Sequence, residues 1–182
     1  MATHAADRPT ALIDSAALIP VYRDAQGAAR VLLIRRGAGG VHGGHLAFPG
    51  GKRDPEDASL RDTAVREAHE EIGLPPDAIE LLADLPPIET RTSGFRIHPF
   101  LARVLRPVQL LPCAREVAGI LEVRLADLAA AGTHQPSATP SMSAGEAQRV
   151  PFYRIGDDQL WGASYRIFHP LLPRLLAGEW RI

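Results

Sequence analysis

The sequence predicts one α/β domain, in which a mixed β-sheet is combined with two or three helices. The length of 182 residues suits one ordinary domain and leaves no room for two full ones. Hydrophobic residues make up 46% of the chain and charged residues 23%, so the chain can bury a sizeable core. Several short apolar segments alternate with turn residues, and one longer segment lacks glycine and proline, a pattern typical of mixed strands and helices.

Six apolar segments bounded by turn residues are predicted to be strands. They span residues 16–22, 30–36, 79–85, 97–105, 119–124 and 150–155. Residues 23–27 supply a turn between the first two segments, so the second strand is expected to return beside the first. A glycine-rich stretch and the short apolar piece Leu46–Phe48 follow the second strand.

Two longer segments are predicted to be helices. Residues 59–72 contain strong helix formers without glycine or proline, and Gly73 ends the segment. A closing helix is expected over residues 165–177, interrupted at Pro170 and Pro173.

The remaining segments are predicted to lie outside regular structure. Residues 1–12 are polar and alanine-rich and are expected to be disordered, so the domain is assigned to residues 13–182. Residues 131–148 are rich in Ser, Pro and Thr and are expected to form a polar loop.

Composition narrows the classes of function. Twenty basic and twenty-one acidic residues give a net charge of −1, which excludes the strongly basic signature of a sequence-independent nucleic-acid binder. The single cysteine, Cys113, excludes an intrachain disulfide and a cysteine-built zinc site. No apolar run approaches the roughly 18 residues of a membrane span, and the N-terminus lacks a leader pattern. A cytoplasmic protein without nucleic-acid or membrane partners is therefore expected.

Three carboxylates share one face of the predicted helix. At about 100° per residue, Glu67, Glu70 and Glu71 fall within an arc of roughly 100°, beside an apolar stripe. Like charges on one helix face are destabilising unless a cation compensates them, and Mg²⁺ or Mn²⁺ would do so. On these three residues alone, a solvated acidic surface is the commoner explanation.

The residues around this face carry a resemblance. The segment from Gly51 to Leu74 resembles the Nudix box, and every fixed position from Arg66 onward matches. The loop after Gly51 is one residue longer than the family pattern and lacks its early glutamate. We assign the early acidic position to Asp57, with Glu56 as the alternative.

The resemblance implies a Nudix fold, a mixed β-sheet sandwiched between α-helices, and metal-dependent hydrolysis of a diphosphate linkage. It implies that Arg66 orients a carboxylate and that Mg²⁺ or Mn²⁺ is bound by oxygen ligands. These ligands would be Gly51, Glu67, Glu70 and Glu71, with Glu116 as a further candidate ligand or base.

The upstream segment from Val31 to Gly51 is similar to the signature of the coenzyme A diphosphatase branch. Gly40 stands where that signature has a second arginine. The similarity implies hydrolysis of coenzyme A to 3′,5′-ADP and 4′-phosphopantetheine. The candidate substrate-binding residues are Arg35, Arg36, His42, Gly50, Gly51 and Lys52. Trp161 and Phe168, in a later stretch that also looks like this branch, are interpreted as packing residues.

Two alternatives stay open at this point. The same machinery could act on another nucleoside diphosphate derivative, such as ADP-ribose, a dinucleotide or a nucleoside triphosphate. The chain could also be a ligand sensor of the Nudix fold that does not hydrolyse, although the complete set of three glutamates speaks against this. The oligomeric state is open as well, with a homodimer as one option.

Overall fold

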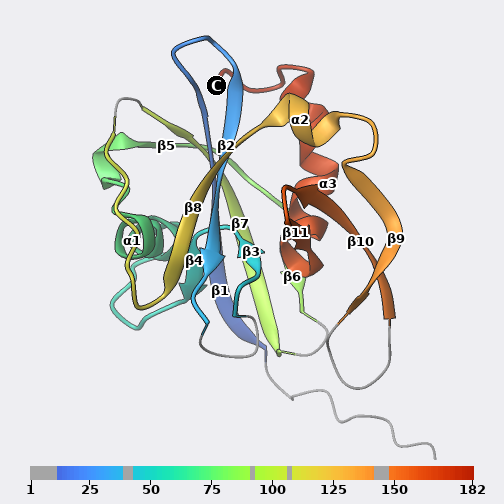
Figure 1. Ribbon diagram of the computed structural model, residues 1–182. Helices are drawn as coiled ribbons and strands as arrows, with labels where there is room; N and C mark the ends of the chain where they lie inside the picture. The colour runs from blue at the N-terminus through green and yellow to red at the C-terminus, as the bar shows by residue number, and fades with distance from the viewer. Residues whose placement is uncertain (1–11, 39–42, 91–92, 106–107, 142–147) are drawn as a thin grey trace, which may run out of the picture.

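The structure is a computed structural model, which describes residues 12–38, 43–90, 93–105, 108–141 and 148–182 (Figure 1). The expected disordered N-terminus lies outside the described residues, apart from Leu12. No helix in these ranges is long and apolar enough to cross a membrane.

An eight-stranded mixed sheet forms the centre of the fold. Its main path runs β3-β2-β1-β7-β5, while β4 pairs with β1, β6 with β7 and β8 with β2. Strands β1 and β7 are parallel and the other pairs are antiparallel. The strands are β1 Ile13–Arg23, β2 Ala29–Arg36, β3 Leu46–Ala47, β4 Gly50–Lys52, β5 Ile79–Asp84, β6 Ile88–Glu89, β7 Phe95–Val104 and β8 Val117–Arg124.

Strand β1 organises the sheet because two strands share one of its edges. Its C-terminal end pairs with β2, and its N-terminal part pairs with β4, so that Ala16 lies opposite Gly51 and Ala17 opposite Gly50. An added Cβ at Gly50 would lie 2.2 Å from the carbonyl oxygen of Ala16, so only glycine fits there. The pairing brings the residues just before α1 against the central strand.

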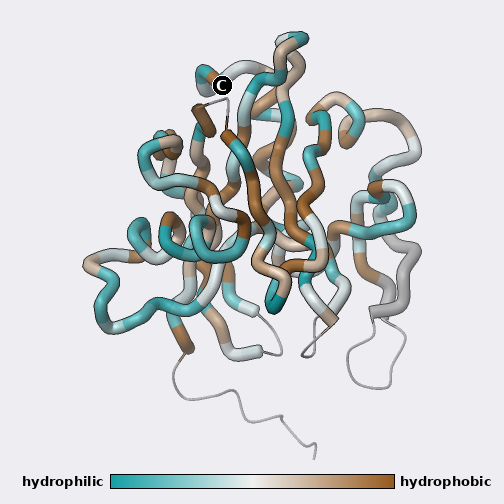
Figure 2. The backbone as a smooth tube through the Cα atoms, turned by 60° about the vertical axis from the view of Figure 1, so that its left-hand side comes forward, coloured by the Kyte–Doolittle hydropathy of each residue, from teal (hydrophilic) through white to brown (hydrophobic). Residues whose placement is uncertain are grey.

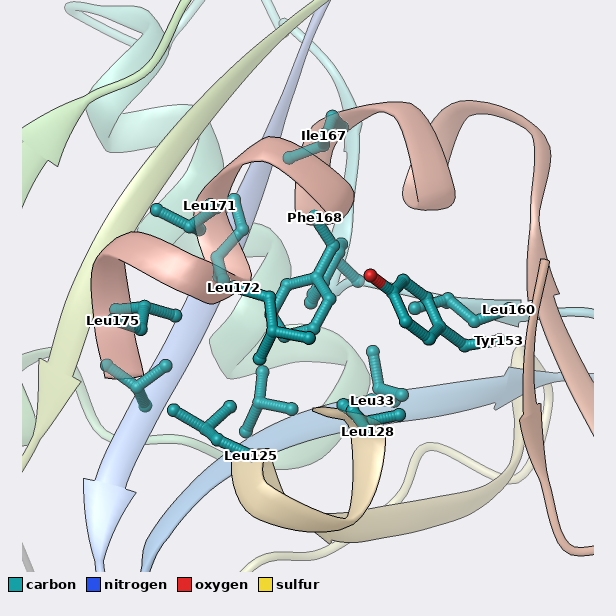
Figure 3. Packing of buried hydrophobic residues seen from close by; sticks show 14 of the residues in the cluster. Leu33, Leu125, Leu128, Tyr153, Leu160, Ile167, Phe168, Leu171, Leu172 and Leu175 are labelled. Carbon is teal, nitrogen blue, oxygen red and sulfur yellow. The ribbon is translucent and has the colours of Figure 1, made fainter. Parts of the chain in front are cut away.

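Helices cover both faces of this sheet, as the resemblance implied. On one face, α1 (Leu60–Ile72) packs Ala64, Ala68 and Ile72 against inward side chains of β1 and β2. On the other face, α2 (Leu125–Ala129) and α3 (Gly162–Leu176) bury Leu125, Leu128 and a row of α3 side chains (Figure 3). The hydropathy colouring of Figure 2 shows apolar residues running through the central strands. Burial on both faces explains the unbroken apolar run of β1 from Ala16 to Tyr22.

The first turn and the end of α1 follow the sequence. The Ser59 hydroxyl accepts the backbone N–H of Asp62 at 3.2 Å and caps the N-terminus of the helix. Gly73 adopts φ 65° and ends the helix. A short 3₁₀ turn, Pro76–Ala78, then leads into β5.

The C-terminal part of the fold corrects two sequence expectations. Residues 131–148 are not a loop throughout, because β9 (His134–Ser141) pairs with β10 (Gln148–Ile155), and β11 (Asp158–Trp161) completes a three-stranded antiparallel sheet. Strand pairing satisfies the backbone here despite the turn-rich composition. Helix α3 is also continuous through Pro170 and Pro173. Both prolines are exposed, and the buried face of α3 holds the helix against the sheet.

Candidate functional site

Glu71, at the end of α1, is the most deeply buried acid of the site. Its residue is only 3% exposed, and its Oε2 accepts the backbone N–H of Gly50 at 2.9 Å. Burial raises the pKa of Glu71 to about 7, against the hydrogen bond from Gly50, which lowers it. The structure thus places a carboxylate inside the molecule, against β4.

Glu67 approaches the backbone of β4 one turn earlier on the helix. A Cβ added to Gly51 would lie 2.2 Å from Glu67 Oε1, so the carboxylate occupies the space that a side chain at residue 51 would fill. Burial raises the pKa of Glu67, while the neighbouring Arg66 opposes that rise. Gly51 is therefore required by the close approach of this carboxylate.

Arg66 connects the acids of the helix. Its Nη1 donates to Glu67 Oε1 at 3.1 Å and to Glu70 Oε2 at 3.0 Å, and its Nη2 donates to the backbone oxygen of Lys52 at 3.1 Å. The Glu70 side chain is 54% exposed, in contrast to Glu71. The guanidinium group thus links the acidic face of α1 to the end of β4 through hydrogen bonds.

Asp57 holds the other side of Arg66. Its two carboxylate oxygens accept Nε and Nη2 of Arg66, each at 2.9 Å, and one of them also accepts the Thr63 hydroxyl at 2.8 Å. The Arg66 guanidinium holds the pKa of Asp57 well below its usual range. Glu56 is exposed. Of the two acids considered for this loop, Asp57 is the one that contacts Arg66.

Glu116 brings a further negative charge to the site from another element. It is exposed and directly precedes β8, where its backbone oxygen accepts the N–H of Gly37 at 2.7 Å. Its charge raises the pKa of both Glu67 and Glu71, whereas Arg36 lowers that of Glu71. Glu116 and Arg36 therefore lie within electrostatic reach of the helix carboxylates.

The donors at this site suit a hard divalent cation. In the described part of the chain, no three His, Cys, Asp or Glu side chains converge as a ready metal-binding set. The carboxylates of Glu67 and Glu70 are instead held by Arg66. Nevertheless, the donors here are all oxygens, the charge of Glu116 raises the pKa values of Glu67 and Glu71, and the Glu67 carboxylate lies directly against the Gly51 backbone. These features fit Mg²⁺ or Mn²⁺.

A pocket of about 340 Å³ adjoins the acids across β4. Gly50, Gly51 and Lys52 line it from β4, and Arg36 lines it from the end of β2. The Lys52 ammonium lies 5.5 Å from the centre of the Phe95 ring, which lines the pocket as well. The pocket thus has two cationic side chains next to the carboxylate cluster.

The remaining residues considered in the sequence differ in whether they line this pocket. Arg35 does not line this pocket and instead pairs with Asp158 of β11, with Nε–Oδ1 at 3.1 Å and Nη2–Oδ2 at 2.5 Å. His42 lies outside the described residues. Phe168 is fully buried in the core, whereas Trp161 lines the pocket. This position of Trp161 could not be predicted from the sequence, because nothing local to residues 158–164 indicates which part of the domain they face.

Comparison with known proteins adds independent information. The family described as NUDIX domain matches residues 12–143. A protein from Citrobacter koseri named uncharacterized Nudix hydrolase NudL is 37% identical over 153 residues, which cover 83% of this chain and 71% of that protein. The crystal structure of RenU, a Nudix hydrolase from M. smegmatis, matches with a TM-score of 0.64 at 21% identity and covers 94% of this chain and 90% of its own. The NUDIX domain of Shewanella oneidensis NrtR, solved with ADP ribose, has a TM-score of 0.52 at 22% identity and covers 66% of this chain and 78% of its own.

Proposed function

This chain belongs to the Nudix family of hydrolases, and from that premise we propose that it hydrolyses the diphosphate linkage of coenzyme A or a derivative. The products would be 3′,5′-ADP and 4′-phosphopantetheine or its acyl form. Nudix enzymes bind small molecules of the nucleotide type and generally use divalent metal ions. We propose Mg²⁺ or Mn²⁺ for this chain.

The observation that carries the proposal is that the carboxylates of α1 and the cationic side chains of the pocket lie next to each other along β4. Glu67 and Glu71 approach the β4 backbone from α1, while Arg36 and Lys52 line the adjoining pocket. A diphosphate needs cationic groups around its oxygens, and a divalent cation needs carboxylates. Both requirements are met around β4, by residues of β2, β4 and α1.

The residues of this chain have separate tasks in the proposal. Glu67, Glu70 and Glu71, with the backbone of Gly51 and with Glu116, would hold the metal ion. When bound, the ion would neutralise charge on the diphosphate oxygens and lower the pKa of the attacking water. Arg66 keeps Glu67 and Glu70 in place, and Asp57 fixes Arg66 in turn.

The chemistry demands positioning and charge neutralisation more than covalent participation. A water oxygen bonds to one phosphorus and the bond from that phosphorus to the bridging oxygen breaks. The second phosphate leaves with the bridging oxygen, and the proton released from the water passes to the solvent. Arg36 and Lys52 would bind the phosphate oxygens through charge-assisted hydrogen bonds. Arg35, which is paired with Asp158, is left out of this role.

Support for coenzyme A comes from the similarity of residues 31–51 to the coenzyme A diphosphatase signature. The test is a panel of coenzyme A, dephospho-coenzyme A and ADP-ribose, each with Mg²⁺ and with Mn²⁺, followed by identification of the phosphate-containing products. Coenzyme A should have the highest kcat/KM, and a 3′-phosphate bound by Arg36 or Lys52 should favour it over dephospho-coenzyme A by about 10- to 100-fold.

The other outcomes are equally informative. Faster hydrolysis of ADP-ribose would reject the coenzyme A assignment and leave the reaction class standing. Binding of these compounds without turnover by the wild type, under conditions where the metal binds, would instead favour a ligand sensor.

A further inference from the structure

The pocket beside the acids is lined in part by a segment that lies outside the residues matched to the NUDIX domain. The family match ends at residue 143, whereas residues 161–164 line the pocket. Trp161 ends β11 of the three-stranded sheet, which lies beside the main sheet, and the other three begin α3 (Figure 1). The part of the chain that supplies the chemistry is therefore different from the part that closes this wall.

Trp161 is the large aromatic side chain of that wall. It is partly exposed, and its ring meets the ring of His45 edge to face, with centroids 4.9 Å apart at 67°. Strand pairing with Phe152 and the ion pair of Arg35 with Asp158, three residues earlier, fix the end of β11. Trp161 is thus held in place at the pocket by contacts made outside it.

Several other residues of the pocket suit a flat apolar group. Phe48, Phe95 and Ile97 line the pocket, and the short side chains of Ala16 and Ala17 leave room for an occupant. An open volume of about 340 Å³ falls within the size range of small-molecule sites. A planar ring gains most from such a site because it can bury its face on an aromatic side chain.

From this arrangement we infer that Trp161 is a specificity-determining residue that packs against a planar nitrogen heterocycle of the substrate, its nucleobase. The inference rests on the proposed function, since a nucleotide-type diphosphate carries its base close to the phosphates. In coenzyme A, the pantetheine half has no ring to offer. The C-terminal segment would then select the base, while α1 and β4 act on the diphosphate.

The test uses two probes that cannot be hydrolysed, titrated by calorimetry into the full chain with Mg²⁺. One is α,β-methylene-ADP, and the other is methylenediphosphonate, which has the two phosphorus groups without the base. Trp161→Ala should weaken binding of α,β-methylene-ADP by about 5- to 100-fold. It should leave binding of methylenediphosphonate unchanged within about twofold. Trp161→Phe, which keeps an aromatic face, should retain most of the affinity for α,β-methylene-ADP.

The fluorescence of Trp161 is a local probe that tests where the base lies. Trp180 is the second tryptophan and packs on Arg174, with the guanidinium carbon 4.6 Å from its ring. In a Trp180→Phe background, Trp161 is the remaining tryptophan, and α,β-methylene-ADP should quench its fluorescence. Quenching by 4′-phosphopantetheine instead would overturn the inference, because the pocket would then hold the other half of coenzyme A.

Failure of the inference and failure of the proposed function give different results. If methylenediphosphonate binds and the base adds no affinity, or if Trp161→Ala weakens both probes equally, the base site is wrong and the diphosphate site stands. If only α,β-methylene-ADP binds and quenches Trp161, the base site stands and the proposed diphosphate site fails. If neither probe binds, both are rejected.

Discussion

Replacing Glu71 by glutamine should stabilise the metal-free protein at alkaline pH. The structure buries this carboxylate almost completely and gives it one hydrogen bond, from the N–H of Gly50. Because folding raises its pKa, the folded state binds the proton more tightly than the unfolded state does. The stability that this proton confers is fully present below the ordinary pKa of 4.5. It is lost as the pH rises through about 7.

The size of the effect follows from the two pKa values. Between the ordinary value of 4.5 and about 7, the ionised carboxylate costs the folded state roughly 3 kcal/mol, at about 1.4 kcal/mol for each tenfold change in proton affinity. A glutamine side chain can keep the bond from Gly50 through its amide oxygen and carries no charge. At pH 8 we therefore expect Glu71→Gln to be more stable by about 2–3 kcal/mol, which raises Tm by roughly 5–10 °C for a chain of this size.

The assay is urea unfolding of both proteins from pH 4 to pH 8.5 in the presence of EDTA. The two curves of unfolding free energy should converge toward pH 4 and separate as the pH rises. Glu70→Gln is the matched control, because its half-exposed side chain should change stability by only a few tenths of a kcal/mol. Saturation with Mg²⁺ at about 100 times its Kd should add about 2.7 kcal/mol to the wild type and less to Glu71→Gln.

Activity gives the second half of this prediction. Glu71→Gln and Glu70→Gln should each lower kcat by at least about 100-fold, since each removes a charged ligand of the proposed metal ion. A Glu71→Gln protein that is less stable than the wild type at pH 8 in EDTA would refute the burial argument. Near wild-type turnover in either variant would refute the assignment of the metal site.

Two further predictions concern the partners of the arginines. Asp57→Ala should slow turnover by about 10-fold at saturating Mg²⁺, because Arg66 loses the carboxylate that fixes it. Glu56→Ala should have little effect. A large loss of turnover in Glu56→Ala with none in Asp57→Ala would show that the two acids are assigned the wrong way round. Arg35→Ala and Asp158→Ala should raise KM to a similar extent, and their effects should not add in the double variant, since the pair positions β11. The charge exchange Arg35→Asp with Asp158→Arg should bring KM part of the way back to the wild-type value. Direct binding of substrate phosphate by Arg35 would instead leave Asp158→Ala without a raised KM.

The sequence by itself determined the elements whose signals are local. The helix of residues 60–72 has a capping serine before it, helix formers within it and a glycine after it, so its place and its acidic face could be predicted. The mixed sheet, with helices on both of its faces, followed from the apolar segments and the resemblance to the Nudix box. The spacing of Arg66, Glu67, Glu70 and Glu71 is likewise a property of the chain alone.

Only the tertiary structure decided how neighbouring residues of the same type differ in burial and in partners. Glu70 and Glu71 are neighbours in sequence, yet β4 packs over one of them and leaves the other half exposed. Arg35 and Arg36 were both predicted to bind substrate phosphate. In the structure, Arg35 pairs with Asp158 of β11, whereas Arg36 lines the pocket. Burial, pKa and partner depend on segments distant along the chain, which no local pattern encodes. The strand at residues 134–141 and the place of Trp161 at the pocket wall depend on such pairing as well.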